Sequence, residues 1–101
     1  MPAAEFTWVV PAAHPAFPGH FPGHPIVPGV VLLDQAIRFA QSLLSAPVAR
    51  WQIGVVKFQG PAGPSDTLVF SLERAPHGAI AFTVTSGARA IATGSLTPVA
   101  P

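Results

Sequence analysis

The chain has 101 residues, of which 50% are hydrophobic and 9% are charged, and its formal net charge is +1 at pH 7. This length predicts one domain over residues 1–101, and so apolar a small domain favours burial of its surplus surface in an oligomer. The low net charge argues against a nucleic-acid partner. The absence of cysteine is typical of a reducing compartment such as the cytoplasm. No apolar run approaches the roughly 20 residues that a membrane span needs.

The first part of the chain predicts a strand and a loop. Residues 5–10, EFTWVV, are aromatic and β-branched and end at Pro11, which is typical of a short strand. No basic region precedes this run, so no signal peptide is expected. Residues 11–28 contain six prolines together with Gly19 and Gly23. Such a composition excludes a regular helix and predicts a loop.

A helix is predicted over residues 30–45. Its polar residues recur at helical spacing on an otherwise apolar cylinder, which indicates a mostly buried helix that Pro47 closes. The start is unusual because neither Pro28 nor Gly29 offers a side chain that could cap the first backbone N–H groups. These donors therefore need another partner.

Four antiparallel strands are predicted after the helix, because short β-rich runs alternate with turns rich in glycine and proline. The strands are expected over residues 51–59, 67–75, 79–87 and 89–99. One long helix followed by such a meander predicts an α+β domain in which an antiparallel sheet wraps the helix.

The histidines offer candidates for chemistry. His77 lies in a predicted hairpin turn, APHGA, and is interpreted as a surface residue. A metal site built from His14, His20, His24 and Asp34 would have suitable ligand types. The intervening prolines separate His20 from His24, so no metal site is predicted.

An imidazole in a stiff loop, an uncapped helix start and Asp34 together suit acid/base chemistry. A neutral imidazole can remove a proton from carbon, and free N–H donors at a helix start can hold a carbonyl oxygen that gains negative charge. This combination favours elimination or hydration next to a thioester. The alternative is that Asp34 is a solvated carboxylate paired with Arg38 at i, i+4.

Residues 20–30, HFPGHPIVPGV, resemble the signature of the hotdog-fold 3-hydroxyacyl-acyl carrier protein dehydratases of fatty acid synthesis. His, Phe, Pro, Gly, Pro, Pro and Gly stand in the family's order and spacing, and the family's carboxylate position falls on Asp34. Residues 56–58 and 63–68 are similar to a second, weaker block of the family. The resemblance implies a hotdog fold, with an antiparallel sheet wrapped around one long central helix.

The resemblance also implies an activity, the dehydration of 3-hydroxyacyl thioesters on acyl carrier protein to trans-2-enoyl thioesters without a cofactor, in fatty acid or polyketide-type synthesis such as that of aryl polyenes. His20 would take the C2 proton, and Asp34 would help the C3 hydroxyl leave as water. Gly29 would give its backbone N–H to the thioester carbonyl. Three further residues are expected at the substrate: Phe21, Pro28 and Val30.

By the same resemblance, the histidine and the carboxylate of one site come from different protomers. This implies a homodimer or larger homo-oligomer with sites at the interface, where an apolar tunnel holds the acyl chain and the phosphopantetheine arm of the carrier enters. Five basic residues are candidates for docking an acidic carrier, although a solvated charge is the simpler interpretation of each: Arg38, Arg50, Lys57, Arg74 and Arg89. The family's isomerising branch has a cysteine where Val30 stands, so no isomerase activity is predicted.

Two alternatives stay open at this point. A hotdog acyl thioesterase would use Asp34 to activate water and would need no imidazole. A non-catalytic subunit that binds acyl groups or their carrier, as a partner within a heterodimer, would need neither group for chemistry.

Overall fold

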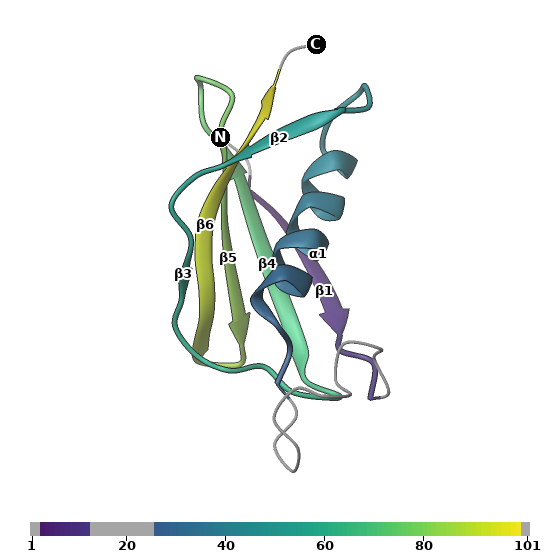
Figure 1. The fold of residues 1–101 in the computed structure, drawn as a ribbon, viewed down its shortest axis with the longest axis vertical. Coiled ribbons are helices and arrows are strands. Elements are labelled where there is room, and N and C mark those ends of the chain that lie inside the picture. Colours follow the sequence, from purple (N-terminus) through teal and green to yellow (C-terminus); the bar gives the residue numbers. More distant parts are fainter. Residues whose placement is uncertain (1–2, 13–25, 100–101) are drawn as a thin grey trace.

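The protein forms one helix and six strands in the computed structural model, which describes residues 3–12 and 26–99 (Figure 1). The elements follow the order expected from the sequence. Their bounds are β1 Ala3–Val9, α1 Gly29–Ser42, β2 Arg50–Ile53, β3 Lys57–Phe58, β4 Thr67–Arg74, β5 Ile80–Ser86 and β6 Arg89–Val99.

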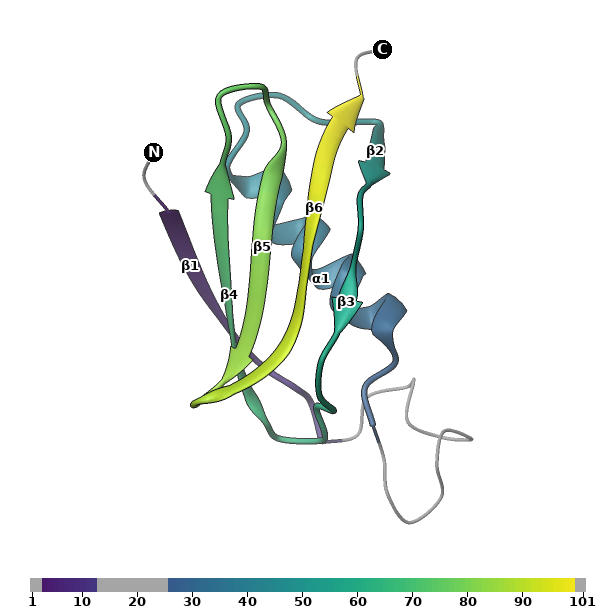
Figure 2. The same cartoon turned by 90° about the vertical axis from the view of Figure 1, so that its left-hand side faces the viewer.

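The strands form a single antiparallel sheet that α1 covers on one face (Figures 1 and 2). The strand order is β1-β4-β5-β6-β2, and β3 also pairs with β6. β1 therefore forms one edge of the sheet, and β2 with β3 forms the other. This arrangement confirms the predicted α+β domain.

The core lies between the sheet and the helix. Alternate residues of β4 and β5 point toward α1 and are buried, as a strand with one covered face requires. The helix contributes Leu32, Ala36 and Ala40, and both alanines are 0% exposed. Their small side chains let the helix approach the sheet closely.

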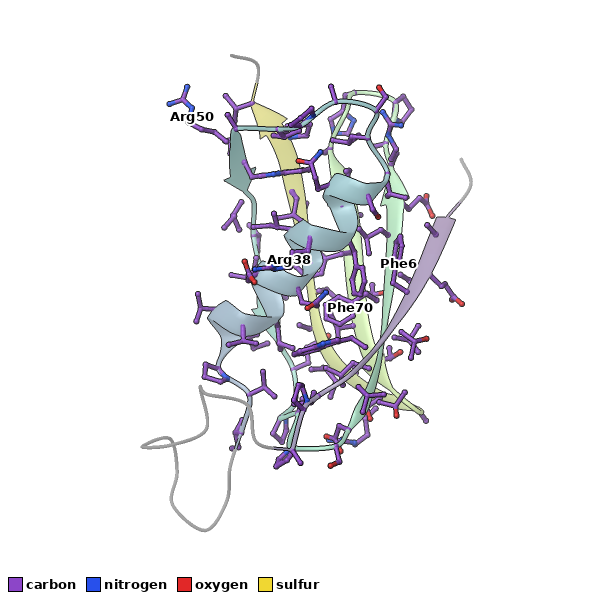
Figure 3. All side chains as sticks on the ribbon, turned by 90° about the vertical axis from the view of Figure 1, so that its right-hand side faces the viewer. Phe6, Arg38, Arg50 and Phe70 are labelled. Carbon is purple, nitrogen blue, oxygen red and sulfur yellow. The ribbon has the colours of Figure 1, made fainter. Side chains whose placement is uncertain are left out.

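Aromatic side chains fill the space between the helix and the edge of the sheet at β1. Phe6 of β1 stacks on Phe39 of α1 with ring centroids 4.5 Å apart. Phe39 also meets Phe70 of β4 edge to face at 5.2 Å, and Figure 3 shows Phe6 and Phe70 in this layer. Offset stacks and edge contacts of this kind are the favoured aromatic geometries.

The single strand predicted over residues 51–59 is divided in the structure into β2 and β3. Ile53 pairs with Leu96, and Lys57 pairs with Thr93. The segment that joins β2 to β3 therefore has one residue more than the part of β6 that faces it. Such an insertion bends a strand as a β-bulge does. Gly54 lies at the bend, where a Cβ atom would collide with Oγ of Ser95. A close approach of this kind does not show in a periodicity pattern.

The helix begins one residue earlier and ends three residues earlier than predicted, at Ser42 rather than at residue 45. Gln41 accounts for the end, because its side-chain amide donates to the carbonyl of Ala46 and accepts from the N–H of Val48. These bonds fold the following residues back on the last turn. No helix in the ranges 3–12 and 26–99 is long and apolar enough to cross a membrane.

Replacing Phe70 with alanine tests the core. Phe70 is 0% exposed and touches two other rings, so Phe70→Ala should lower the free energy of unfolding by about 3–5 kcal/mol in urea denaturation. Thr83→Ala, on the open face of the neighbouring strand β5, is the control and should cost less than about 1 kcal/mol. Equal losses in the two variants would contradict this placement of the core.

Candidate active site

As the sequence predicts, the start of α1 has backbone donors without an acceptor among residues 3–12 and 26–99. Pro28 occupies the N-cap position with φ −61° and ψ 146°, and it makes no side-chain capping bond. Its carbonyl accepts bonds from the N–H groups of Val31 at 3.0 Å and Leu32 at 3.4 Å. No residue that the structure describes accepts a bond from the N–H of Gly29 or Val30. These donors lie at the positive end of the helix dipole, where an oxyanion is stabilised.

The ring of Phe58 covers Gly29. A Cβ atom built on Gly29 would lie 2.6 Å from Cζ of Phe58 and 2.9 Å from its Cε1, well inside van der Waals contact. Phe58 belongs to β3, and its side chain is 54% exposed. The helix start therefore has an apolar wall on one side. Sequence reasoning missed this role, because only the fold brings residues 29 and 58 together.

Asp34 lies on the exposed side of the helix. Its Oδ2 accepts a hydrogen bond of 2.8 Å from Nε of Arg38, and the two side chains are 61% and 71% exposed (Figure 3 labels Arg38). The i, i+4 pair expected as the alternative is thus formed. The helical repeat places Asp34 about 7.5 Å along the axis and about 140° around it from Gly29. Within one chain, Asp34 thus projects from a different side of the helix than Gly29 and is bonded to Arg38.

Some of the remaining predicted site residues lie in the ranges that the structure describes, and others do not. His20 and Phe21 lie outside the described residues, as do His14 and His24 of the metal hypothesis. Val30 is 71% exposed beside the free N–H groups. His77 is exposed in the turn between β4 and β5, as interpreted from the sequence. Within the described ranges, no group of three or more His, Cys, Asp or Glu side chains could hold a metal ion.

Exposed apolar side chains gather at the helix start and along the edge formed by β2 and β3. Val55 is 79% exposed and Ile53 is 47% exposed, and both lie on the edge segment that carries Phe58. Val30 extends this surface to the helix. The remaining large exposed hydrophobic residue in the described ranges, Val9, is at the end of β1. An apolar patch on an open sheet edge is typical of an interface.

The five basic residues are spread over the molecule. Arg38 pairs with Asp34 and Arg89 pairs with Asp66. Arg74 lies at the opposite end of the molecule from the helix start, where it lines a cavity of about 450 Å³ with the segment after α1 and the end of β6. Arg50 begins β2 at that same end (Figure 3). A single chain therefore does not gather these cations around Gly29.

The comparisons with known proteins identify the family. A family model described as ApeI-like, ApeI dehydratase, matches residues 2–95. The chain belongs to the ApeI-like dehydratase family.

Part of this ApeI-like chain is also similar in sequence to curated dehydratases. The 3-hydroxyacyl-[acyl-carrier-protein] dehydratase FabZ of Desulforamulus reducens is 35% identical over 71 residues, which cover 63% of this chain and 50% of the relative. FabZ of Roseiflexus castenholzii is 41% identical over 61 residues, which cover 54% of this chain and 43% of the relative. The chain thus spans about half the length of the curated relatives it matches.

Solved structures confirm the hotdog fold. The dehydratase heterocomplex ApeI:P from Xenorhabdus doucetiae contains a chain that superposes with a TM-score of 0.83 at 27% identity, covering 94% of this chain and 85% of that one. The (R)-hydratase from A. caviae superposes with a TM-score of 0.68 at 16% identity, over 97% of this chain and 95% of that one. The second likeness shows the fold alone.

The contact between Gly29 and Phe58 can be tested by a double-mutant cycle. Gly29→Ala alone should lower the free energy of unfolding by about 1–3 kcal/mol, because the new methyl group forces the Phe58 ring aside. In a Phe58→Ala background the same change should be neutral or stabilising, since alanine has the higher helix propensity. Urea denaturation of the four proteins measures the coupling. Additive effects would mean that the ring does not cover Gly29.

Proposed function

We propose that this protein dehydrates 3-hydroxyacyl thioesters to trans-2-enoyl thioesters, with the thioester carbonyl bound at the start of α1. The observation that carries the proposal is the pair of N–H groups at Gly29 and Val30, the last two residues of the HFPGHPIVPGV motif, for which the described residues offer no acceptor. Donors of this kind act where negative charge develops, which in this reaction is the carbonyl oxygen after C2 loses its proton.

In the proposed reaction His20 is the base. It takes the C2 proton while the N–H of Gly29 stabilises the enolate-like carbonyl oxygen. The bond from C3 to its hydroxyl then breaks with the help of Asp34, and the departing oxygen takes up the equivalent of the proton that His20 removed from C2, so that one water leaves for each double bond formed. Val30, Pro28 and Phe21 would border the acyl group. No cofactor enters this scheme.

The second part of the proposal is that a partner completes the site. Asp34 is turned away from Gly29 of its own helix, and in one chain its carboxylate is open to water. The apolar side chains of Ile53, Val55 and Phe58 lie along the sheet edge formed by β2 and β3, and Val30 lies at the helix start. A second copy could add its own edge here and bury these side chains. We infer that the protein is a homodimer, or a larger homo-oligomer of such dimers, and that Asp34 serves the site of the neighbouring protomer.

The proposed substrate is carried on acyl carrier protein. The names of the FabZ relatives specify that carrier, and the same names fit a role in fatty acid or polyketide-type synthesis. The thioester would reach Gly29 on a phosphopantetheine arm. Lys57, on the β3 edge next to Phe58, is the basic residue nearest in sequence to the exposed apolar surface.

A second candidate is a subunit of a dehydratase heterocomplex, favoured by the ApeI:P assembly of Xenorhabdus doucetiae. In that case the apolar edge of this chain would meet a different hotdog subunit. The thioesterase alternative has no comparable support, because the similar fluoroacetyl-CoA thioesterase FlK is 13% identical and shares the fold alone.

The activity is tested with 3-hydroxyacyl groups of varied length loaded on a carrier protein. Mass spectrometry should detect a product lighter by one water. His20→Ala and Asp34→Asn should each lower kcat by about 10²–10⁴-fold, the usual contribution of a positioned acid or base. His77→Ala removes an exposed turn histidine and should leave kcat unchanged. Release of a free thiol without an enoyl product would indicate a thioesterase instead.

The assembly is tested with a charge placed on the exposed edge. Val55→Glu puts a carboxylate in the apolar surface and should convert the dimer to monomer in sedimentation velocity, with loss of activity. Val9→Glu is the matched control, since Val9 is also more than half exposed but lies on β1, at the other edge of the sheet. It should leave both the mass and the activity unchanged.

Mixing two inactive variants separates the homodimer from a heterocomplex subunit. If His20 and Asp34 of one site come from different chains, equal amounts of His20→Ala and Asp34→Asn should recover about a quarter of the wild-type rate after subunit exchange. Recovery requires that heterodimers carry one intact site. A dimer whose mixed variants stay inactive would place both residues in one chain, and a monomer that is active only with another hotdog subunit would favour the heterocomplex.

A further inference from the structure

The turn between β3 and β4, residues 60–66, holds both chain segments that border residues 13–25. On one side, the N–H of Val10 donates to the carbonyl of Asp66 at 2.9 Å, and the N–H of Ser65 donates to the carbonyl of Val10 at 2.8 Å. On the other side, the N–H of Val27 donates to the carbonyl of Ala62 at 2.7 Å. The end of β1 and the approach to α1 are thus fastened to one turn.

These attachment points are buried, although they lie at one end of the molecule. Val10 is 1% exposed, Ala62 is 2% exposed and Val27 is 6% exposed, and all belong to the hydrophobic core. A buried backbone N–H that loses its acceptor costs free energy, so a displaced turn would carry Val27 with it. Gly29 follows Val27 by two residues. The position of the helix start therefore depends on the turn.

One ion pair holds the turn in shape. Oδ2 of Asp66 accepts a bond of 2.8 Å from the N–H of Gly63 within the turn and lies 3.5 Å from Nη2 of Arg89. Nη1 of the same guanidinium donates to the carbonyl of Pro61 at 3.0 Å. Arg89 is the first residue of β6, immediately after the turn from β5. Its planar fork joins the beginning and the end of the 60–66 turn to the body of the sheet.

The turn needs such support because its backbone is strained. Ser65 has φ +67°, and it is the one residue other than glycine in the described ranges with a left-handed backbone. A conformation of this kind persists where the surrounding contacts impose it. Ser65 stands between Pro64 and Asp66, so the carboxylate that meets Arg89 adjoins the strained residue.

We propose that Asp66 and Arg89 are positioning residues of the dehydratase site. They fix the 60–66 turn, and through its bonds to Val10 and Val27 the turn fixes the end of β1 and the position of Gly29 at the helix start. This inference rests on the proposed function for its effect on catalysis. It assigns a task to two residues, 23 positions apart, that touch neither substrate nor reacting atoms.

Two conservative substitutions test the proposal. Arg89→Gln removes the charge and the fork, and Asp66→Asn removes the charge while keeping an acceptor for Gly63. Each should lower kcat by about 10- to 100-fold with KM changed by less than about twofold, because misplaced donors weaken the transition state more than ground-state binding. Glu73→Gln, at an exposed position of β4, is the matched control and should leave kcat unchanged.

Amide hydrogen exchange, followed by NMR, supplies a measurement that does not depend on activity. In Arg89→Gln the amides of Val10 and Val27 should exchange at least about tenfold faster, while those of the core strand residues Phe70 and Leu72 keep their rates. A variant that only loses overall stability would instead speed all four amides together. Arg89→Lys, which keeps the charge but not the fork, replaces Arg89→Gln if that protein does not fold and should show the same selective pattern.

The outcomes separate the two proposals. If the wild-type protein turns over substrate and both variants keep its kcat, the positioning role is overturned and the dehydratase proposal stays intact. An unchanged exchange rate at the amide of Val27 in Arg89→Gln would have the same meaning. If the wild-type protein dehydrates no 3-hydroxyacyl substrate, the proposed function fails. The selective exchange at Val10 and Val27 would then still support the attachment of both segments by Asp66 and Arg89, and its absence would overturn it.

Discussion

The close packing of α1 on the sheet is the constraint on which the candidate site depends. Ala36 and Ala40 are fully buried at this contact, and their small side chains let the helix approach β4 and β5 closely. With the helix fixed in this way, its first residue arrives beside β3, under the ring of Phe58. The geometry at Gly29 is therefore a consequence of core packing several turns away.

The same packing places Asp34 on the side of the helix that is open to water. A helix that buries one stripe of residues must expose the opposite one, and Asp34 and Arg38 lie on that exposed stripe. The helical repeat places this carboxylate about 7.5 Å along the axis from Gly29 and on another side of the helix. Beside these residues lies an unpaired sheet edge with exposed Val55 and Ile53. Under the proposed function, a site that combines Gly29 with Asp34 would take its carboxylate from a neighbouring protomer.

The sequence predicts whatever depends on local pattern and fails where distant residues meet. Periodicity was sufficient for the helix and the strands, and the lack of a capping side chain at Pro28 and Gly29 correctly indicated open donors. The bulge that separates β2 from β3 depends on Gly54 meeting Ser95, which lie far apart in the sequence. The contact of Asp66 with Arg89 is of the same kind. Secondary-structure propensity depends on neighbouring residues and cannot predict such contacts. The helix end likewise depends on the bonds that the side chain of Gln41 makes to residues after the helix.

The chemistry of the helix start depends on what Pro28 and Gly29 lack. A serine or aspartate at the N-cap would bond to the N–H groups that follow and close the site to a ligand. Proline has no such side chain, its φ of −61° suits the entry to a helix, and its carbonyl still accepts the bonds from Val31 and Leu32. Glycine then leaves room for the ring of Phe58. In the proposed function, the backbone at these two residues is therefore itself the functional group.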